Sequence, residues 1–119
     1  MSTDNKSLLP EISVSNFLQV DIRVGQICQA IDNSKARKPA YILTIDFGEL
    51  GKKTSSAQIT DNYSKEELLG KKVVAVVNFA PKKIAGVKSE VLVLAAVCDR
   101  NGTVLIEPNL EVENGTRIA

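Results

Sequence analysis

A change of phase in the first apolar pattern is the feature that most restricts how this chain folds. Ile22 and Val24 lie on one face of the first predicted strand, whereas after Gly25 the apolar positions move to Ile27 and Ile31. Side chains of a strand alternate between its faces, so the phase slips only where an extra residue is inserted. We therefore expect a β-bulge or a sharp bend at Gly25, which would allow one long strand to serve both halves of a small barrel.

Similar patterns predict further strands. Residues 41–47 alternate apolar and polar side chains, which is typical of a half-buried strand, and residues 73–79 are a run of β-branched residues, which is typical of a central one. We expect residues 91–98 to be another deeply buried strand. The predicted strands are residues 21–32, 41–47, 53–60, 73–79 and 91–98, followed by a hairpin turn at 99–102 and an appended strand at 104–106.

One short helix is predicted between the third and fourth strands. Ser64 and Glu67 have the spacing of a capping box, Leu68 and Leu69 give a small apolar face, and Gly70 is able to end the helix. Five strands with a helix at this place have the order of the all-β OB-fold, a Greek-key barrel that often binds oligonucleotides. An SH3-like barrel is the structural alternative, but it needs no helix there.

The two ends of the chain are expected to lie outside the barrel. Residues 1–14 are predicted to be a flexible tail and residues 15–119 a single domain, which begins with a helical turn and ends with a surface extension from residue 107. Phe17 and Leu18 place a large apolar pair on the helical turn. Such a pair needs a cover, either the end of the chain's own barrel or a second subunit.

Composition excludes several classes of chemistry. The 119 residues contain no histidine, which excludes Ser-His-Asp and Cys-His catalysis and histidine-ligated zinc, and the acids are too scattered for a catalytic pair. We expect neither an enzyme nor a metal or cofactor. No stretch reaches membrane-spanning length and no signal peptide is evident, so a cytoplasmic protein without membrane insertion is predicted. Cys28 and Cys98 are expected to be two buried free thiols, with a single bridge as the alternative.

Basic side chains gather in the middle of the sequence. Residues 35–88 hold eleven basic and five acidic groups, a local charge of +6 in a chain whose net charge is +1. The loops after the first and fourth strands of an OB barrel flank one face, so these groups would form a local anion-binding surface. Ordinary solvated lysines are the alternative. The groups considered are Lys35, Arg37, Lys38, Lys52, Lys53, Lys82, Lys83 and Lys88.

Few aromatic side chains are available to stack on bases. Tyr41, Phe47 and Phe79 are expected in the core. A protein that stacks successive bases of a single strand is therefore disfavoured. Contact with the backbone of a folded RNA needs fewer exposed rings.

Apolar residues interrupt the basic loop after the fourth strand. Ile84, Ala85 and Val87 have no evident use in a purely electrostatic site. They would line a pocket for an extended peptide, with Asn78 and Ser89 supplying hydrogen bonds. Closure of the end of the barrel is the alternative use of these residues.

Three stretches of the chain resemble one known family. They are residues 21–25 (DIRVG), 55–60 (SSAQIT) and 73–94 (VVAVVNFAPKKIAGVKSEVLVL). Together they are similar to the CsaA proteins, a branch of the tRNA-binding-domain family whose domain also occurs at the C-terminus of bacterial methionyl-tRNA synthetases. The resemblance extends over about residues 17–118.

The resemblance implies an OB-fold homodimer with the N-terminal segment and the C-terminal extension at the interface. It also implies a chaperone related to protein export, which binds unfolded or precursor polypeptides and associates with the secretion ATPase. The expected interface residues are Phe17, Leu18 and Ile118.

Relatives in the tRNA-binding branch grip the outer corner of tRNA with a face that carries the pattern Asn-x-x-Pro-x-x-x-x-Gly-x-x-Ser. The resemblance places this pattern on Asn78, Pro81, Gly86 and Ser89. The next position departs from that branch, because Glu90 stands where the tRNA-binding relatives have a small residue, and an acid there repels phosphate.

We therefore predict a non-enzymatic CsaA-like chaperone. A structure-specific tRNA-binding protein that acts through backbone contacts is the alternative. The predicted contact residues for polypeptide or tRNA are Arg37, Lys38, Lys52, Lys53, Ser55, Asn78, Lys82, Lys83, Ile84, Lys88, Ser89 and Glu90.

Overall fold

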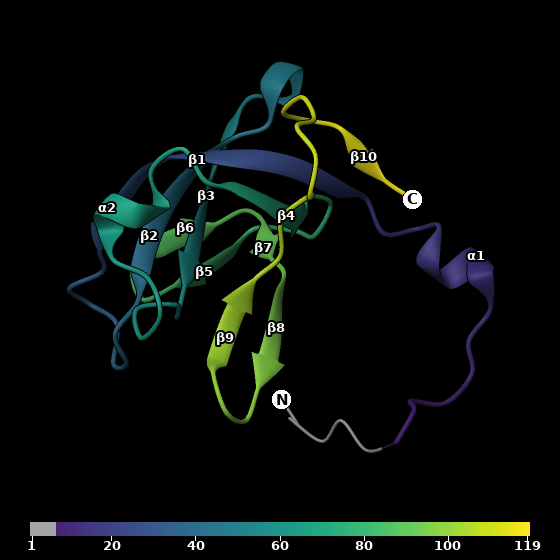
Figure 1. Cartoon of the computed structure of the whole chain (residues 1–119), viewed down its shortest axis with the longest axis horizontal. Helices are drawn as coiled ribbons and strands as arrows, with labels where there is room; N and C mark the ends of the chain where they lie inside the picture. Colours follow the sequence, from purple (N-terminus) through teal and green to yellow (C-terminus); the bar gives the residue numbers. More distant parts are fainter. Residues whose placement is uncertain (1–6) are drawn as a thin grey trace.

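The computed structural model describes residues 7–119, which form a barrel of antiparallel strands with an N-terminal arm at one side (Figure 1). Part of the predicted tail, residues 1–6, lies outside the described residues. The helices are α1 (Val14–Phe17) and α2 (Lys65–Leu68), with a 3-10 turn at Gly48–Leu50. The strands are β1 (Ile22–Asp32), β2 (Tyr41–Asp46), β3 (Lys52–Ala57), β4 (Lys72–Val76), β5 (Lys82–Ile84), β6 (Val87–Ser89), β7 (Leu92–Val93), β8 (Ala95–Cys98), β9 (Gly102–Leu105) and β10 (Arg117–Ile118).

The main sheet has the order β3-β2-β1-β4-β7, and β10 pairs with the start of β1. Each neighbouring pair is antiparallel. β5 with β6 and β8 with β9 form two separate hairpins, and α2 falls between β3 and β4 in the chain. This nearly closed five-stranded barrel confirms the predicted all-β class and OB-type strand order.

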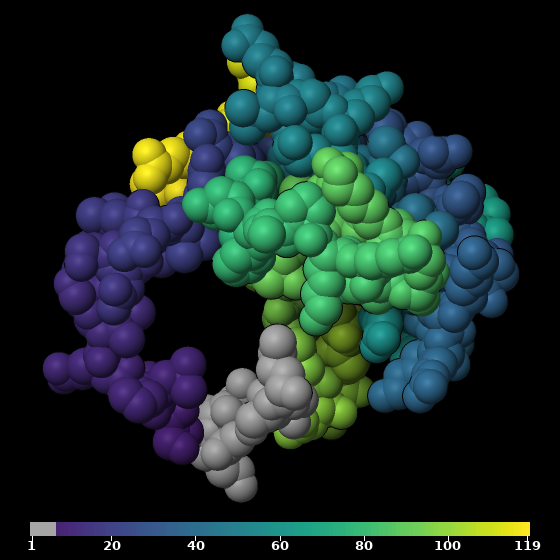
Figure 2. All heavy atoms as spheres, turned by 180° about the vertical axis from the view of Figure 1, so that it is seen from behind, coloured from purple at the N-terminus to yellow at the C-terminus, as the bar shows by residue number. Residues whose placement is uncertain are grey.

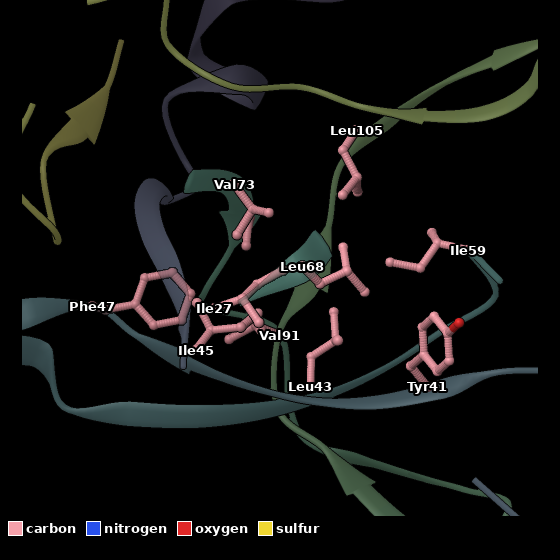
Figure 3. Close-up of a cluster of buried hydrophobic side chains, with 11 residues drawn as sticks. Ile27, Tyr41, Leu43, Ile45, Phe47, Ile59, Leu68, Val73, Val91 and Leu105 are labelled. Carbon is pink, nitrogen blue, oxygen red and sulfur yellow. The ribbon is translucent and has the colours of Figure 1, made fainter. Parts of the chain in front are cut away.

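The alternation along β2 builds the core of the barrel. Tyr41, Leu43 and Ile45 are buried, and Phe47 follows them inward directly after the strand, as the sequence predicts. Figure 3 shows these side chains together with others, from Ile27 on β1 to Leu105 on β9. The complete cluster is Ile27, Tyr41, Leu43, Ile45, Phe47, Ile59, Leu68, Val73, Ala75, Val91 and Leu105.

β1 runs through Gly25 without a bulge, so the predicted kink at this residue is wrong. The register of β1 with β4 is continuous from Ile22 to Gln26. The bulge lies further along, where the register with β2 shifts between Ile27 and Gln29. The apolar pattern changes phase because both faces of β1 are covered. One face is buried near Ile22 and the opposite face near Ile27.

Close packing explains the glycine in β1. A Cβ built on Gly25 would lie 2.5 Å from Cγ2 of Ile45 and 2.7 Å from the ring of Phe47. A larger residue at this position would displace the core. The opposite face of β1 belongs to a second cluster, made of Ile22, Val74 and Val76 with Val20, Leu94 and Ile118 packed against it.

The bulge also determines which residue at the end of β1 is buried. Ile31 was expected inside, but its side chain is exposed, and Ala30 packs against the core instead. One extra residue at Cys28 reverses the inward and outward positions that follow it. The prediction for Ile31 is therefore wrong because it placed the shift at the wrong residue.

Two other apolar predictions are corrected by the path of the chain. Residues 91–98 do not form one deeply buried strand but two short ones, β7 and β8, and the side chain of Leu92 is 49% exposed. Phe79 was expected in the core and is 54% exposed. β4 ends at Val76, so Phe79 lies beyond the part of the chain that the sheet orients inward.

The predicted capping box of the helix is confirmed. The Ser64 hydroxyl accepts from the Glu67 N–H at 3.2 Å, and the Glu67 carboxylate accepts from the Ser64 N–H at 3.0 Å. Cys28 and Cys98 are free thiols, as expected, but Cys28 is exposed rather than buried because it lies on the bulge. Within residues 7–119, no helix is long and apolar enough to cross a membrane.

Candidate functional site

The basic loop after β4 is an ordered hairpin. β5 and β6 pair Ile84 with Val87, which leaves Ala85 and Gly86 as the two residues of the turn. Their φ angles are 47° and 82°. Two successive positive φ angles are what a type I′ hairpin turn requires, and glycine adopts them at little cost. The hairpin therefore fixes the directions of its lysine side chains.

Three exposed lysines lie on this hairpin. Lys83 is directly opposite Lys88, and Lys82 precedes them on β5. Within residues 7–119, none of the three forms an ion pair with a carboxylate. Like charges in opposed positions of a hairpin repel one another, so a bound anion would relieve this repulsion.

The loop after β1 lies against the turn of this hairpin. The Lys35 side chain covers Gly86, with its Cδ 2.9 Å and its Nζ 3.5 Å from the place that a Cβ would occupy. Figure 2 shows the blue surface of this part of the chain beside the green surface of the hairpin. Asn33 orders the loop, because its Oδ1 accepts from the Lys35 N–H at 3.1 Å. Arg37 and Lys38 follow and are exposed.

The third basic group lies at the start of β3. Lys52 is exposed and Lys53 is half-buried. β3 runs beside the end of the hairpin, where the Thr54 hydroxyl donates to the Lys88 carbonyl oxygen at 2.7 Å. The structure thus brings together all three basic segments that the sequence analysis singled out. We call the surface region around residues 35–38, 52–53 and 82–88 the basic face. Within it, Lys83 and Lys88 lie on one side of the hairpin, and Lys82 lies on the other side with Ile84.

Glu90 is bonded to β3 rather than free to meet a ligand. Its Oε1 accepts from the Thr54 N–H at 3.1 Å and lies 3.1 Å from the Thr54 hydroxyl oxygen, whose shorter bond is the one to the Lys88 carbonyl oxygen. The Glu90 N–H donates to the Thr54 carbonyl oxygen at 2.8 Å. The backbone N–H of Thr54 lowers the pKa of Glu90 below its ordinary value, with a smaller contribution from nearby lysines. The carboxylate therefore stays charged within the basic face.

Two serines among the predicted contacts have structural bonds. Ser55 is buried, and its hydroxyl donates to the Val91 carbonyl oxygen at 3.0 Å. Ser89 is half-buried, and its hydroxyl accepts from the Ser56 N–H at 3.3 Å. Both bonds join β3 to the segment after β5. In this structure Ser55 supports the site from behind, whereas Ser89 reaches its surface.

A pocket of about 240 Å³ lies beside the hairpin. Phe79 and Leu92 give it apolar walls, with Ile84 40% exposed among them, and Lys82 stands at its rim. Apolar side chains gathered in one depression of a charged surface are typical of a docking site for an apolar group. Of the residues that the sequence analysis assigned to a pocket, Ile84 and Ser89 line this one, whereas Ala85, Val87 and Asn78 do not, and Phe79 was not expected in it.

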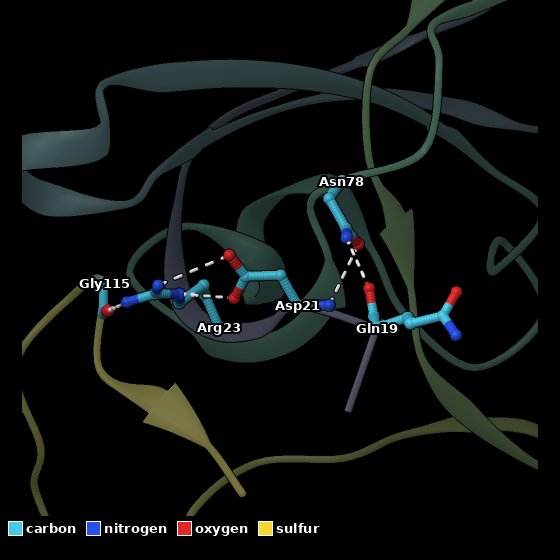
Figure 4. Close-up of polar contacts among 5 residues, drawn as sticks. All are labelled: Gln19, Asp21, Arg23, Asn78 and Gly115. Carbon is cyan, nitrogen blue, oxygen red and sulfur yellow. Dashed lines mark hydrogen bonds and ion pairs between the residues drawn. The ribbon is translucent and has the colours of Figure 1, made fainter. Parts of the chain in front are cut away.

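Asn78, a predicted contact, is occupied within the protein. Its Nδ2 donates to the Gln19 carbonyl oxygen at 2.7 Å, and its Oδ1 accepts from the Asp21 N–H at 2.9 Å (Figure 4). The amide thus holds the root of the N-terminal arm against the end of β4. Asn78 positions the pocket wall, because Phe79 is the next residue.

The same region contains an ion pair that sequence reasoning missed. Arg23 donates through Nε to Asp21 at 2.6 Å and through Nη1 to the Gly115 carbonyl oxygen at 3.1 Å (Figure 4). The hydrogen bond from Arg23 lowers the pKa of Asp21. The sequence contains one signal of this pair. Asp21 and Arg23 are two positions apart, and such side chains lie on the same face of an extended strand.

Three lysines in the middle of the chain are not available to a ligand in the same way. They pair with carboxylates outside the basic face, at Nζ–O distances of 2.8, 3.6 and 3.3 Å. The pairs are Lys65 with Asp32, Lys71 with Glu107, and Lys72 with Glu111. The excess charge therefore concentrates on the basic face more than the sequence count indicates.

The residues expected at a subunit interface are partly uncovered. Phe17 and Leu18 are exposed on α1, which stands away from the barrel (Figure 1). Ile118 on β10 is half-buried against the cluster of Ile22, Val74 and Val76. The chain's own barrel thus does not cover the apolar pair on α1.

The barrel, the basic face and the pocket define a binding domain of the OB type. The family described as "Putative tRNA binding domain" matches residues 22–117, and this chain belongs to that family. Among solved structures, it is similar to the chaperone CsaA of Bacillus anthracis str. Ames (51% identity, TM-score 0.88) and to the CsaA chaperone protein of Picrophilus torridus (51% identity, TM-score 0.87). Each match covers 92% of this chain and 100% of the other.

Curated relatives include much longer proteins. The methionine–tRNA ligase of Archaeoglobus fulgidus is 41% identical over 108 residues, which are 91% of this chain and 16% of the ligase. This chain therefore spans about one sixth of the length of the curated ligases that it matches. A protein related to methionyl-tRNA synthetase from Pyrococcus horikoshii is 32% identical, with a TM-score of 0.83, over 93% of this chain and all of its own.

Proposed function

We propose that this protein is a non-enzymatic chaperone of the CsaA type, which binds extended unfolded or precursor polypeptides. The pocket beside the hairpin carries the proposal, because Phe79, Ile84 and Leu92 expose apolar surface there next to Lys82. Apolar side chains of an unfolded chain would be removed from water there. The 51% identity to solved CsaA chaperones supports this assignment.

Such a site would select clients only weakly by sequence. One shallow apolar pocket accepts many side chains, and the surrounding lysines attract acidic or polar segments without fixed geometry. Precursors destined for export are the proposed clients, with the secretion ATPase as a partner and the cytoplasm as the place of action. No catalytic step is part of the proposal.

A homodimer belongs to the same proposal. Phe17 and Leu18 expose large apolar side chains at α1, and Ile118 lies on a short outer strand. A second copy would cover these residues through a two-fold interface. Two pockets on one particle would then bind one long client by avidity.

tRNA is the second candidate ligand, and the opposed pair Lys83 and Lys88 favours it. Phosphates would relieve the repulsion of this pair, and contacts to the backbone need no stacking rings. Glu90 still opposes tRNA binding, because its carboxylate stays charged, although the Thr54 N–H holds it against β3.

The test is binding of fluorescein-labelled, reduced and carboxymethylated lactalbumin, a permanently unfolded polypeptide, to the full chain. We expect binding that changes little between low and near-physiological salt and that Phe79→Ser weakens at least about fivefold, since one buried aromatic contact is lost. Leu69→Ser is the matched control, because Leu69 and Phe79 are each 54% exposed but Leu69 lies beyond α2. Equal binding by both variants, or no binding by the parent, would overturn the proposal.

A further inference from the structure

The segment Ser7–Ile12 exposes apolar side chains that nothing in the barrel explains. Leu8 is 98% exposed and Leu9 is 89% exposed, and Ile12 is exposed as well. Figure 2 shows the purple arm standing away from the barrel. These residues also precede the family match, which begins at residue 22. An apolar cluster of this kind marks a segment that has a binding partner.

The arm is anchored at the rim of the pocket. The Asn78 amide holds both the Gln19 carbonyl oxygen and the Asp21 N–H, and the next residue, Phe79, forms the pocket wall. The anchor therefore holds the C-terminal end of the arm next to the pocket, because Asn78 and the pocket residue Phe79 are neighbours in the chain. A segment tethered this closely has an effective concentration of the order of millimolar.

The length of the arm allows it to fold back. Leu9 lies ten positions before Gln19, and four residues of this stretch are helical in α1. At about 3.4 Å for each extended residue and 1.5 Å for each helical one, the arm reaches about 26 Å from its anchor. That is close to the shortest extent of the molecule, 30 Å. Leu8 and Leu9 thus have ample chain to return to a pocket at the anchor.

The chemistry of the arm matches that of the pocket. Leu8 and Leu9 are suited to the apolar walls, Pro10 keeps the segment extended, and Glu11 supplies a negative charge for Lys82 at the rim. Glu90 also lines the pocket, but Thr54 already bonds its carboxylate. We infer that residues 7–12 act as a tethered pseudo-client, which occupies the pocket of its own chain and competes with polypeptide clients.

This inference rests on the proposed polypeptide site and adds its regulation. Removal of residues 2–12 leaves Ser13, whose hydroxyl caps α1 by accepting from the Ser15 N–H at 3.2 Å. We expect the shortened chain to bind the labelled unfolded lactalbumin about three- to tenfold more tightly than the full chain, since a tethered competitor is lost. The double variant Leu8→Ser/Leu9→Ser should show the same gain. Leu110→Ser, which changes an exposed leucine that does not line the pocket, should show none.

A second measurement detects the contact directly. A photoreactive benzoylphenylalanine at position 9 of the full chain should cross-link to residues 79–92 of the same molecule, as peptide mapping of monomeric products would show. Equal affinity of full and shortened chains, or cross-links only elsewhere or only between molecules, would overturn the inference. If neither chain binds lactalbumin, the proposed function fails, and the cross-link still decides whether the arm enters the pocket.

Discussion

Lys83 and Lys88 lie directly opposite each other in the β5–β6 hairpin, and each is exposed. Opposed like charges destabilise a hairpin, whereas most exposed lysines in strands are accommodated beside neutral or acidic partners. Lys35 adds a third positive charge beyond the turn, where it lies over Gly86. Repulsion between these lysines therefore makes the hairpin less stable than it would be with uncharged residues at the same positions.

Replacement of one lysine should separate stability from binding. Lys88→Thr removes the repulsion and keeps the Lys88 carbonyl position that Thr54 bonds. We expect the free energy of unfolding in urea to rise by about 0.2–0.5 kcal/mol while the affinity for tRNA falls. A variant that loses stability would show that the two charges do not repel in the folded protein.

Salt dependence distinguishes the two ligands. If three to five phosphates are engaged, the affinity for bulk tRNA should fall with a log–log salt slope of about −3 to −5, whereas polypeptide binding should change far less. Reversing the charges of Lys82 and Lys83 to glutamate should abolish tRNA binding and only weaken polypeptide binding. Arg100→Glu, at the exposed turn between β8 and β9, is the control. Equal losses of both activities would mean that the two sites coincide.

The Asn78 amide should contribute more to the free energy of unfolding than its exposed position suggests. Asn78→Ala removes two hydrogen bonds that join the root of the arm to the end of β4. We expect a loss of about 1–2 kcal/mol in the free energy of unfolding, from two bonds of ordinary strength at a partly solvated position. Asn109→Ala is the matched control, because that side chain is exposed like the side chain of Asn78. An equal effect of the two variants would contradict a structural role for Asn78.

Gly25 should tolerate no side chain. Gly25→Ala forces a methyl group to within 2.5 Å of Ile45 and 2.7 Å of Phe47, and such overpacking typically destabilises by about 1–3 kcal/mol. The double variant with Ile45→Ala should be less destabilised than the sum of the two single changes, because the smaller side chain makes room. Strict additivity, measured by urea denaturation, would show that the methyl group is accommodated elsewhere.

Glu90 should make stability depend on pH in a defined direction. Its pKa is lowered in the folded protein by the Thr54 N–H, so its contribution is present above the ordinary carboxyl range and is lost as the pH falls through the lowered pKa. The parent should exceed Glu90→Gln in stability at pH 7, and the difference should narrow between about pH 5 and pH 3. Glu49→Gln, an exposed control without side-chain hydrogen bonds in the described chain, should show no such trend. A constant difference would refute the assignment.

Local patterns predicted the parts of the fold that short segments determine by themselves. The capping box of Ser64 and Glu67 needs only four residues, and the alternation of Tyr41, Leu43 and Ile45 needs only one strand. The order of strands and helix then selected the OB-type barrel. The basic segments were also evident from the sequence, because charge can be counted without knowing the fold.

The errors have one physical origin, since burial depends on partners far along the chain. Ile22 and Gly25 both face packed atoms, one in each cluster, because the C-terminal segment covers the outer face of β1. No pattern within β1 contains that information. Phe79 looked like a core residue because it continues an apolar run, but the sheet ends three residues earlier, at Val76.

The predicted site residues fall into two groups. Some already form hydrogen bonds within the protein, whereas others have no such partner in the described part of the chain. Asn78 and Ser55 carry hydrogen-bonding groups that suit a ligand, yet both are satisfied inside the protein. A sequence shows which groups are able to bond, but not which partner they meet. The lysines of the hairpin are the opposite case, since they have no carboxylate partner within residues 7–119.

The pairing of β10 with the start of β1 bears on how quickly the domain forms. Ile22 pairs with Ile118, and Arg23 bonds the Gly115 carbonyl oxygen across 92 positions of the chain. Such contacts stabilise the folded chain only after a very long loop has closed, and this requirement slows folding. Until residues 115–118 arrive, Ile22 and the edge of β1 beside it remain open to other molecules. We therefore expect the domain to be most exposed to aggregation in the interval before these two distant segments pair.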